Sequence, residues 1–282
     1  MKSNTNVQEK AELKKAVSLY CVQRGISKAD FAVKVGVSSA TLSNIENERW
    51  EKVSEAMCKK IWSQLKKEST GNLYNTIDFE SVCKLCESAQ KHHLMIGLIG
   101  DTGTGKTTSL TAYSKNRNVY RITFEKSMNP KQFFITVLKE MGVDFEGGVN
   151  AMINRLSEEL NSKQSPLVII DEAGKITHTI MLYLHDLREK TKNNCGYVLA
   201  GMPYFKTNLQ KFSNKTKEGY SEFYRRINLW HTLEGLNSEE TEYICRTHGI
   251  NDPVRLRELS RKRRFGDLMN EILLDKVIRE EI

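Results

Sequence analysis

The sequence predicts an α/β protein in which helices cover both faces of a parallel sheet, with an all-α domain before it and a small helical lid after it. Two patterns lead to this fold class. From position 94 onward, short apolar runs alternate with amphipathic helical segments, which is typical of a parallel sheet buried on both faces. Before position 68 and after position 237, helical periodicity alone is present.

Five apolar runs are the candidate strands. They are Leu94–Ile99, Val119–Phe124, Leu167–Ile170, Tyr197–Ala200 and, less clearly, Leu229–Leu233. A polar stretch at 68–76 has the composition of a linker. We therefore expect an all-α domain at 1–67, an α/β core at 77–235 and a helical lid at 236–282.

The composition is that of a globular protein with an excess of positive charge. Of 282 residues, 39% are hydrophobic, and 43 Lys and Arg against 35 Asp and Glu give a net charge of +8. Residues 1–70 carry 13 basic and 8 acidic residues, and the run from Arg255 to Arg264 carries six basic residues and one acidic residue. This distribution favours nucleic acid as a partner.

Other classes of protein are disfavoured. No apolar run approaches the roughly 20 residues that span a bilayer, so no membrane partner is expected. The polar N-terminal residues predict no secretory signal, and the 6 cysteines lack the spacing of a disulfide framework, so a reducing cytoplasm is expected. Cys83 and Cys86, with His92 and His93 downstream, leave a zinc site open, but their spacing beside Val82 favours a packed helical face.

The N-terminal domain has the pattern of a helix-turn-helix. Helices are expected at 12–24, 28–35, 39–46 and 53–65. Ser27 is the expected N-cap of the second helix, with Asp30 at the capping-box position, and Ser38 or Ser39 caps the third. Gly36 permits the tight turn between them.

The stretch Phe31–Glu46 resembles the helix-turn-helix of phage repressors. In that motif, the N-terminal residues of the second helix meet base edges in the major groove. The resemblance implies DNA contacts from Ser39, Thr41, Ser43 and Asn44. The alternative is a helical bundle used for protein contacts.

A complete G-x-x-x-x-G-K-[ST] phosphate-binding motif follows the first apolar run. It consists of Gly100, Asp101, Thr102, Gly103, Thr104, Gly105, Lys106 and Thr107, and Thr108 follows it. The glycines let backbone N–H groups turn toward phosphate oxygens, and the next helix adds positive potential at its N-terminus. We expect Lys106 to reach the β- and γ-phosphates of ATP and Thr107 to ligate Mg²⁺.

The third apolar run delivers a pair of carboxylates. Asp171 and Glu172 directly follow Leu167–Ile170, so they are expected at the carboxyl edge of the sheet, where ligands bind in open α/β sheets. Asp171 is the expected second Mg²⁺ ligand. Glu172 is suited to orient or deprotonate the attacking water of ATP hydrolysis.

Arg225 and Arg226 lie in the segment Phe223–Ile227, after the fourth candidate strand. Such a pair is suited to supply a finger to the γ-phosphate in a neighbouring subunit, with Arg226 as the first choice. The alternative is a solvated basic patch.

Together these motifs resemble the AAA+ ATPases and, more narrowly, the target-selection ATPases of transposition, the family of the phage Mu B protein. The segments that carry the narrower resemblance are Val168–Ala173, Val198–Gly201 and Phe223–Ile227, together with the P-loop and the helix-turn-helix. The resemblance implies an ATP- and Mg²⁺-dependent protein that assembles on double-stranded DNA, often as a helical filament. It also implies that the protein delivers target DNA to a transposase and stimulates it.

A protein that follows duplex DNA in this way needs phosphate contacts on the ATPase unit itself. The expected contacts are Lys126 and Lys131, in the loop after the second strand, and Lys175, after the Asp-Glu pair. A further basic run, Lys206–Lys217, has the Asn, Ser and Thr content of a mobile loop. The alternative for each of these lysines is a solvated side chain.

Two positions depart from the family pattern. Met202 stands where a polar sensor is expected after the fourth strand, and Met269 stands where the lid usually carries an arginine. Arg264, in the preceding turn, is the candidate substitute. Both changes predict slow hydrolysis, stimulated by DNA or a partner, which suits a switch.

Two other functions stay open on the sequence. In one, the helix-turn-helix binds a single operator and nucleotide gates that binding, as in a transcriptional regulator. In the other, the protein loads a hexameric helicase. The first alternative requires DNA contacts from the N-terminal domain only.

Overall fold

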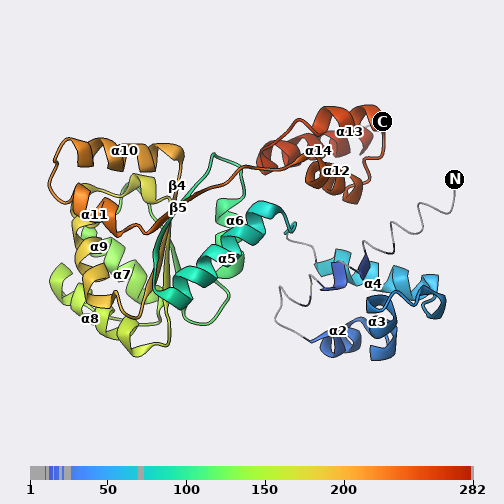
Figure 1. Cartoon of the computed structure of the whole chain (residues 1–282), viewed down its shortest axis with the longest axis horizontal. Helices are drawn as coiled ribbons and strands as arrows, with labels where there is room; N and C mark the ends of the chain where they lie inside the picture. Colours follow the sequence, from blue (N-terminus) through green and yellow to red (C-terminus); the bar gives the residue numbers. More distant parts are fainter. Residues whose placement is uncertain are drawn as a thin grey trace. The chain divides into compact units, whose positions relative to one another are not determined.

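The structure, a computed structural model, describes residues 10, 13–14, 16–18, 21, 27–68 and 73–280. The chain divides into two compact units, Met1–Asn75 and Thr76–Ile282 (Figure 1). The division falls inside the stretch 68–76 that has the composition of a linker.

A five-stranded sheet forms the centre of the second unit, in the order β2-β3-β4-β1-β5 with every neighbouring pair parallel. The strands are β1 (Met95–Ile99), β2 (Val119–Thr123), β3 (Leu167–Asp171), β4 (Gly196–Gly201) and β5 (Leu229–Thr232). The predicted α/β class with a parallel sheet is therefore confirmed, and each strand lies where an apolar run predicted it.

Helices cover both faces of the sheet, as Figure 1 shows. One face packs on α5 (Ile77–His92) and α6 (Lys106–Tyr113). The other faces α7 (Pro130–Glu140), α8 (Val149–Ser162), α9 (His178–Thr191), α10 (Pro203–Asn214) and α11 (Tyr220–Arg226). A short 3₁₀ turn, η2 (Ala173–Lys175), connects β3 to α9.

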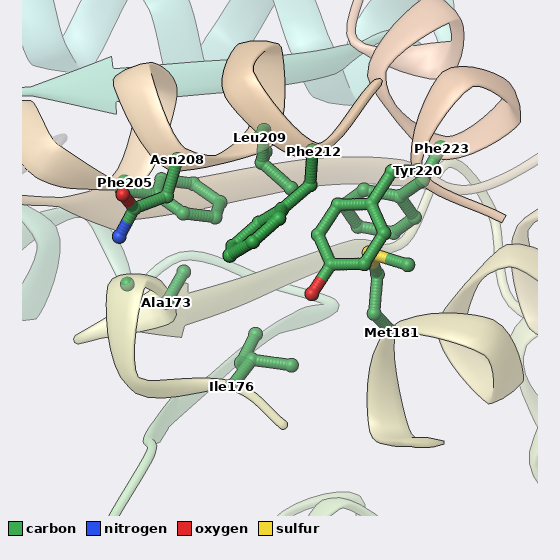
Figure 2. Close-up of a pocket in the computed structure, with 10 residues that line it drawn as sticks. Ala173, Ile176, Met181, Phe205, Asn208, Leu209, Phe212, Tyr220 and Phe223 are labelled. Carbon is green, nitrogen blue, oxygen red and sulfur yellow. The ribbon is translucent and has the colours of Figure 1, made fainter. Parts of the chain in front are cut away.

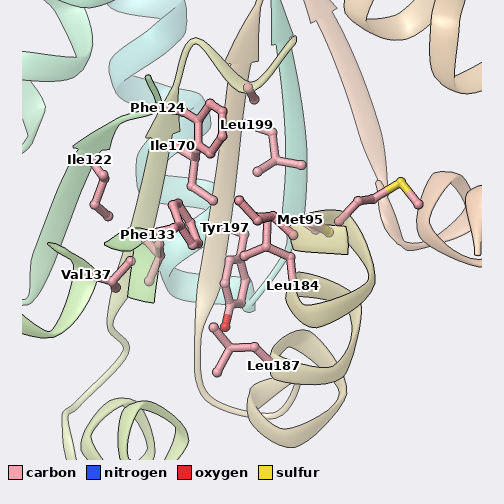
Figure 3. Packing of buried hydrophobic residues seen from close by; sticks show 14 of the residues in the cluster. Met95, Ile122, Phe124, Phe133, Val137, Ile170, Leu184, Leu187, Tyr197 and Leu199 are labelled. Carbon is pink, nitrogen blue, oxygen red and sulfur yellow. The ribbon is translucent and has the colours of Figure 1, made fainter. Parts of the chain in front are cut away.

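The two cores arise from the alternation of side chains along each strand. In β4, Tyr197 and Leu199 join the larger cluster under α7 to α11, whereas Val198 and Ala200 join the smaller cluster under α5 and α6. Figure 3 shows Tyr197 and Leu199 packed beside Leu184 of α9. The central strands are buried on both sides, which explains why their sequences read as continuous apolar runs.

A glycine in β1 makes room for a tryptophan in the neighbouring strand. Gly97 pairs with Trp230 of β5, and a Cβ atom at Gly97 would lie 2.3 Å from the indole ring. The indole also stacks on Tyr224 of α11, with ring centroids 5.9 Å apart, and meets Phe205 of α10 edge-on at 5.6 Å. The absent side chain therefore lets one aromatic ring connect two helices to the sheet.

A helical lid follows β5. It consists of α12 (Ser238–Thr247), α13 (Pro253–Leu259) and α14 (Phe265–Glu280). Its connection to the core is held by the buried carboxylate of Asp78, at the start of α5, which accepts N–H bonds from Glu234 at 3.2 Å and Gly235 at 2.8 Å.

The predicted mobile loop at Lys206–Lys217 is wrong for most of its length, because α10 continues to Asn214. Apolar Phe205 and Leu209 on one face of this segment are buried, and they hold it as a helix. Lys217 also has a fixed environment, since its ammonium group lies 5.0 Å from the centre of the Phe212 ring and 5.2 Å from that of Tyr220.

The first unit contains α2 (Lys28–Val35), α3 (Ser39–Glu46), the 3₁₀ turn η1 (Trp50–Lys52) and α4 (Glu55–Glu68). Ser27 and Asp30 form the expected capping box, Ser38 caps α3, and Gly36 adopts the left-handed conformation with φ 70°. Phe31, Leu42 and Ile61 are among the residues of its core. The helix expected at 12–24 lies largely outside the described residues.

In the described part of the chain, no helix has the length and apolar character needed to cross a bilayer. The same residues contain no cluster of three or more His, Cys, Asp or Glu that could hold a metal. Cys86 is fully buried on α5, and burial raises the pKa of the Cys83 thiol to about 11. Cys86 therefore packs in the apolar cluster under α5 and α6.

Asp78 gives the first testable prediction. The substitution Asp78→Ala leaves the N–H groups of Glu234 and Gly235 without their acceptor, which costs about 1–3 kcal/mol and lowers the Tm by roughly 3–8 °C. Thermal unfolding followed by circular dichroism measures this change. The matched control is Glu87→Ala, an exposed carboxylate on the same helix. Equal Tm values for the two variants would contradict this role of Asp78.

Candidate active site

The loop between β1 and α6 has the backbone shape of a phosphate cradle. Gly103 and Gly105 have φ values of 80° and 92°, which side chains with a Cβ rarely adopt. Lys106 begins α6, so the N–H groups of the first turn of this helix face the loop. The conformation explains why the motif requires glycine at both positions.

Lys106 is held within this loop. Its side chain is 8% exposed, and its ammonium group donates to the carbonyl oxygens of Gly100 and Asp101, both at 2.7 Å. Burial lowers the pKa of Lys106, and the carboxylates of Asp171 and Glu172 oppose that shift. An ammonium group has three N–H donors, so one remains to meet a phosphate oxygen.

Two oxygen ligands for a metal lie together beside the loop. The hydroxyl of Thr107 donates to Oδ2 of Asp171 at 2.9 Å, and Oδ1 of Asp171 accepts the N–H of Glu172 at 3.0 Å. Asp171 is 1% exposed at the end of β3. A buried carboxylate beside a hydroxyl is the oxygen donor set that Mg²⁺ takes next to phosphate groups, so these two residues fit the expected ion.

Glu172 occupies a constrained position. Its backbone is left-handed, with φ 59° and ψ 31°, and such backbone conformations cluster at functional sites. Its carboxylate forms an ion pair with Lys175, with Nζ and Oε2 3.0 Å apart. The bond to Glu172 raises the pKa of Lys175. Lys175, one of the expected DNA contacts, ends the η2 turn and pairs with the candidate catalytic carboxylate.

Arg121 is a charged residue of this site that the sequence analysis did not identify. It lies in β2, and its Nη2 donates to Oδ2 of Asp171 at 2.9 Å. The same nitrogen lies 3.2 Å from the hydroxyl of Thr123. The available signal was an arginine inside an otherwise apolar strand segment, since a buried charge requires a partner.

The lid contacts the loop directly. Nη2 of Arg264 lies 3.2 Å from Oδ2 of Asp101, and the N–H of Gly266 donates to the carbonyl of Gly103 at 2.9 Å. Arg264 therefore reaches the phosphate-binding loop from the turn before α14, where it was the candidate substitute for Met269. Met269 itself is half-buried on α14.

The other sensor position also lies at the loop. Met202 precedes α10, and its sulfur lies 3.7 Å from the hydroxyl of Thr102. A thioether is a weak acceptor without a donor, so this contact cannot supply the proton donor that a γ-phosphate would need.

The arginine pair lies at the end of α11, away from the contacts described so far. Nη2 of Arg226 pairs with Oε1 of Glu189 on α9 at 2.7 Å, and Arg225 is exposed. Among the described residues, no hydrogen bond or ion pair joins either arginine to the phosphate-binding loop. Neither arginine therefore contacts the phosphate-binding loop of its own chain in the described residues.

Of the expected DNA contacts in the first unit, Ser39 and Ser43 are exposed and Asn44 is half-buried. The assignment of Thr41 is corrected, because this residue is 4% exposed. Its hydroxyl lies 2.9 Å from that of Ser38 and donates to the sulfur of Met57 at 3.7 Å. Thr41 thus supports the start of α3 instead of facing a ligand.

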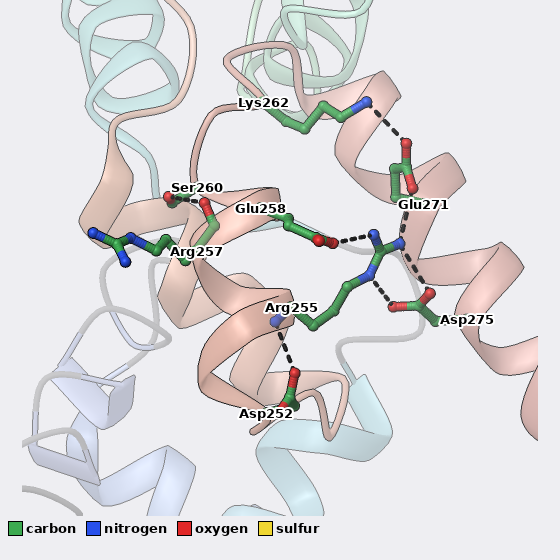
Figure 4. Close-up of polar contacts among 8 residues, drawn as sticks. All are labelled: Asp252, Arg255, Arg257, Glu258, Ser260, Lys262, Glu271 and Asp275. Atoms are coloured by element: carbon green, nitrogen blue, oxygen red, sulfur yellow. Dashed lines mark hydrogen bonds and ion pairs between the residues drawn. The ribbon is translucent and has the colours of Figure 1, made fainter.

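In the second unit, Lys126 and Lys131 are exposed on either side of Asn129, which caps α7. The basic run Arg255–Arg264 is different, because three of its six basic residues form ion pairs: Arg255 and Lys262 pair within the lid (Figure 4), and Arg264 pairs with Asp101. Arg255 binds Asp275 through two nitrogens, at 2.9 and 3.0 Å, and bonds to both Glu271 and Glu258. These bonds raise the pKa of Arg255 further above its ordinary value.

An apolar pocket of about 100 Å³ adjoins the turn that follows Glu172. Figure 2 shows its aromatic wall, and the lining includes Ile176, Phe205, Phe212, Tyr220 and Phe223. Ala173 and Gly174 of the η2 turn close one side. The lining also includes the polar side chain of Asn208.

Comparison with known proteins identifies the fold that carries this site. Residues 89–209 match a family model described as an AAA domain. The α/β unit has the fold of an AAA+ P-loop ATPase. Its sheet order, P-loop and carboxylates at the edge of β3 agree with that assignment. A search of curated proteins found no match to the sequence.

Solved AAA+ structures share the fold at low sequence identity. The Aeropyrum pernix ORC1 protein, solved in complex with DNA, is 13% identical with a TM-score of 0.51, over 73% of this chain and 60% of that chain. The Aeropyrum pernix ORC2 protein, in ADPNP and ADP complexes, is 15% identical with a TM-score of 0.45, over 60% of this chain and 50% of that chain. The chain thus spans about half the length of ORC2.

The replication initiator DnaA, bound to AMPPCP and single-stranded DNA, is 16% identical with a TM-score of 0.49, over 74% of this chain and 66% of that chain. At these identities, the comparisons establish the fold only. The roles of individual residues rest on the geometry of this chain.

The second prediction separates binding of nucleotide from its hydrolysis. Lys106→Ala removes the ammonium group at the phosphate cradle, so binding of a fluorescent ATP analogue is lost. Glu172→Gln keeps that binding but stops phosphate release, because an amide cannot accept the proton of the attacking water. The exposed Lys91→Ala is the control for both measurements. Hydrolysis at the normal rate in Glu172→Gln would show that another group activates the water.

Proposed function

We propose that this protein is an ATP-dependent DNA-binding AAA+ ATPase that assembles on target DNA and recruits or stimulates a transposase. One observation carries the core of this proposal. The P-loop and the metal-ligand pair of Thr107 and Asp171 are assembled at 2.9 Å, in a chain whose other unit presents the helix pair α2–α3. The reference to transposition rests on the motif resemblance.

The chemistry follows from positions around the loop. The backbone of Gly100–Thr107 and the ammonium group of Lys106 bind the phosphates. Thr107 and Asp171 would hold Mg²⁺, which would supply charge stabilisation to the phosphate groups. Glu172 accepts a proton from water as the water oxygen attacks the γ-phosphorus. The bond to the β-phosphate oxygen then breaks, and ADP and phosphate leave.

Three features favour slow turnover. Met202 offers no donor to the γ-phosphate, and the carboxylate of Glu172 is paired with Lys175. Arg264 is bound to Asp101 of the loop and must reorient to reach a phosphate. Slow turnover suits a switch in which the ATP-bound form persists on DNA, and release of Glu172 from Lys175 would speed hydrolysis.

The first unit supports binding in the major groove. In α3, the exposed Ser39 and Ser43 and the neighbouring Asn44 lie on the part of the helix that enters the groove in repressor-type proteins. The left-handed Gly36 ends α2, and the small residue Ala32 is buried within α2, as the close packing of two helices in this motif requires. The structure of ORC1 in complex with DNA adds support for DNA as a partner of this fold.

The second unit supports contacts with the phosphate backbone. Lys126, in the loop after β2, and Lys131, in the first turn of α7, are exposed, and each subunit of a filament would present the same pair of charges. Lys175 is exposed and pairs with Glu172, so a phosphate would compete with this carboxylate for its ammonium group. Such contacts bind all sequences alike, as target selection requires.

A nucleotide-gated regulator that binds one operator is the second candidate. The observation in its favour is the internal pairing of Arg255, Lys262 and Arg264, which leaves the second unit with less charge for DNA than its sequence suggests. In this case only the first unit would touch DNA.

DNA affinity against salt distinguishes the two functions, and this is the third prediction. For a target-selection ATPase, Lys126→Ala with Lys131→Ala weakens binding to all sequences and reduces the slope of log K against log salt by about one unit per lost contact. Lys91→Ala with Lys115→Ala, elsewhere in the second unit, is the matched charge control. An unchanged slope in the first double variant, with binding abolished by Ser39→Ala with Asn44→Ala, would instead favour the operator-binding regulator.

The fourth prediction concerns assembly. If Arg226 leaves Glu189 and acts at a neighbour's γ-phosphate, then Arg226→Ala and Lys106→Ala are each inactive alone but recover part of the ATPase activity when mixed. One variant supplies an intact P-loop and the other an intact arginine. Mixtures of Arg225→Ala with Lys106→Ala show which arginine acts. Absence of recovery in both mixtures, with all variants folded, would exclude a finger supplied between subunits.

A further inference from the structure

Arg121 and Thr107 bind the same carboxylate oxygen. Nη2 of Arg121 and Oγ1 of Thr107 each lie 2.9 Å from Oδ2 of Asp171. The other oxygen, Oδ1, accepts the N–H of Glu172 at 3.0 Å. The carboxylate that would serve Mg²⁺ is thus already bonded on both oxygens and neutralised by a guanidinium group.

The position of Arg121 is not explained by packing. Alternation along β2 places Arg121 on the same face as Val119, whose side chain belongs to the apolar cluster under α5 and α6. The facing residue in β3 is Ile169 of the same cluster. The arginine side chain is only 17% exposed, and its Nε is buried without a hydrogen-bond partner among the described residues. A buried charge with one unsatisfied donor is costly, and an apolar residue would serve the cluster better.

We propose that Arg121 sets the magnesium affinity of the site, so that the ion binds strongly only together with the phosphates of a nucleotide. This inference rests on the proposed ATPase function. The guanidinium group of Arg121, bound to Asp171, repels a divalent cation at the neighbouring metal position. The N-terminus of α6 adds positive potential there. The negative charge that outweighs both must come from the nucleotide.

The alternative role for Arg121 is to hold the carboxylate of Asp171 in place and so to strengthen metal binding. If Arg121 only holds Asp171 in the orientation that Mg²⁺ needs, its removal loosens the carboxylate and weakens metal binding. The two roles therefore predict changes of opposite sign, and a substitution that keeps the positive charge distinguishes charge from shape.

The test measures metal-dependent nucleotide binding without hydrolysis, in the full chain carrying Glu172→Gln. Binding of a fluorescent ATP analogue is titrated with Mg²⁺ in Arg121→Gln, Arg121→Lys and the unsubstituted background. We expect Arg121→Gln to lower the half-saturating Mg²⁺ concentration by about tenfold, because one charge is removed next to the ion. Arg121→Lys should stay near the background value. Arg117→Gln, an exposed arginine just before β2, controls for the loss of net charge.

A second measurement needs no nucleotide. Binding of Mn²⁺ to the nucleotide-free protein, followed by electron paramagnetic resonance, should be weak in the wild-type chain and stronger in Arg121→Gln. Strong Mn²⁺ binding by the wild-type chain would overturn the inference even if Arg121→Gln does not fold. An unchanged or raised Mg²⁺ requirement in folded Arg121→Gln would also overturn it.

The outcomes separate this inference from the proposed function. If the wild-type chain shows no Mg²⁺-dependent nucleotide binding, the proposed ATPase function fails. If it shows such binding and Arg121→Gln does not change the metal requirement, the ATPase function stands and the role of Arg121 is rejected.

Discussion

The bond between the hydroxyl of Thr107 and the carboxylate of Asp171 is the contact on which the site depends. It joins the first turn of α6 to the end of β3, and so connects the phosphate-binding loop to the sheet. The two strands involved, β1 and β3, are not neighbours, since β4 lies between them. Burial of all three strands holds this spacing, and the metal ligands inherit the rigidity of the core.

Local sequence patterns were sufficient to predict the strands and the loop between β1 and α6. The strands were predicted from apolar runs, and the loop was predicted from its sequence motif. A short, continuous apolar run between helical segments is typical of a parallel strand that is buried on both faces. The P-loop is recognised by its fixed order of residues. Contacts between segments far apart in the sequence could not be predicted from local patterns. Arg121 lies 50 positions before Asp171, and nothing in the local sequence around either residue specifies their pairing.

Three other assignments show where local patterns misled. Thr41 has the right position for a DNA contact, but its side chain faces the core of the first unit. The polar run that ends at Lys217 reads as a loop, yet buried Phe205 and Leu209 make most of it a helix. The basic charges of Arg255 and Lys262 read as a binding surface, whereas acidic residues on α13 and α14 neutralise them. Each error comes from a tertiary partner that lies beyond the local sequence.

The contact between Gly97 and Trp230 has a consequence for the evolution of this fold. A side chain at Gly97 would occupy the space of the indole ring, so a larger residue at this position requires a smaller residue at position 230. In related chains, a larger residue in place of Gly97 in β1 should therefore be accompanied by a smaller residue in place of Trp230 in β5. Because the indole also packs on Tyr224, the covariation should extend to the helix that carries Arg225 and Arg226. Chains in which both residues are replaced should therefore pack α11, the helix that carries the two arginines, differently against the sheet.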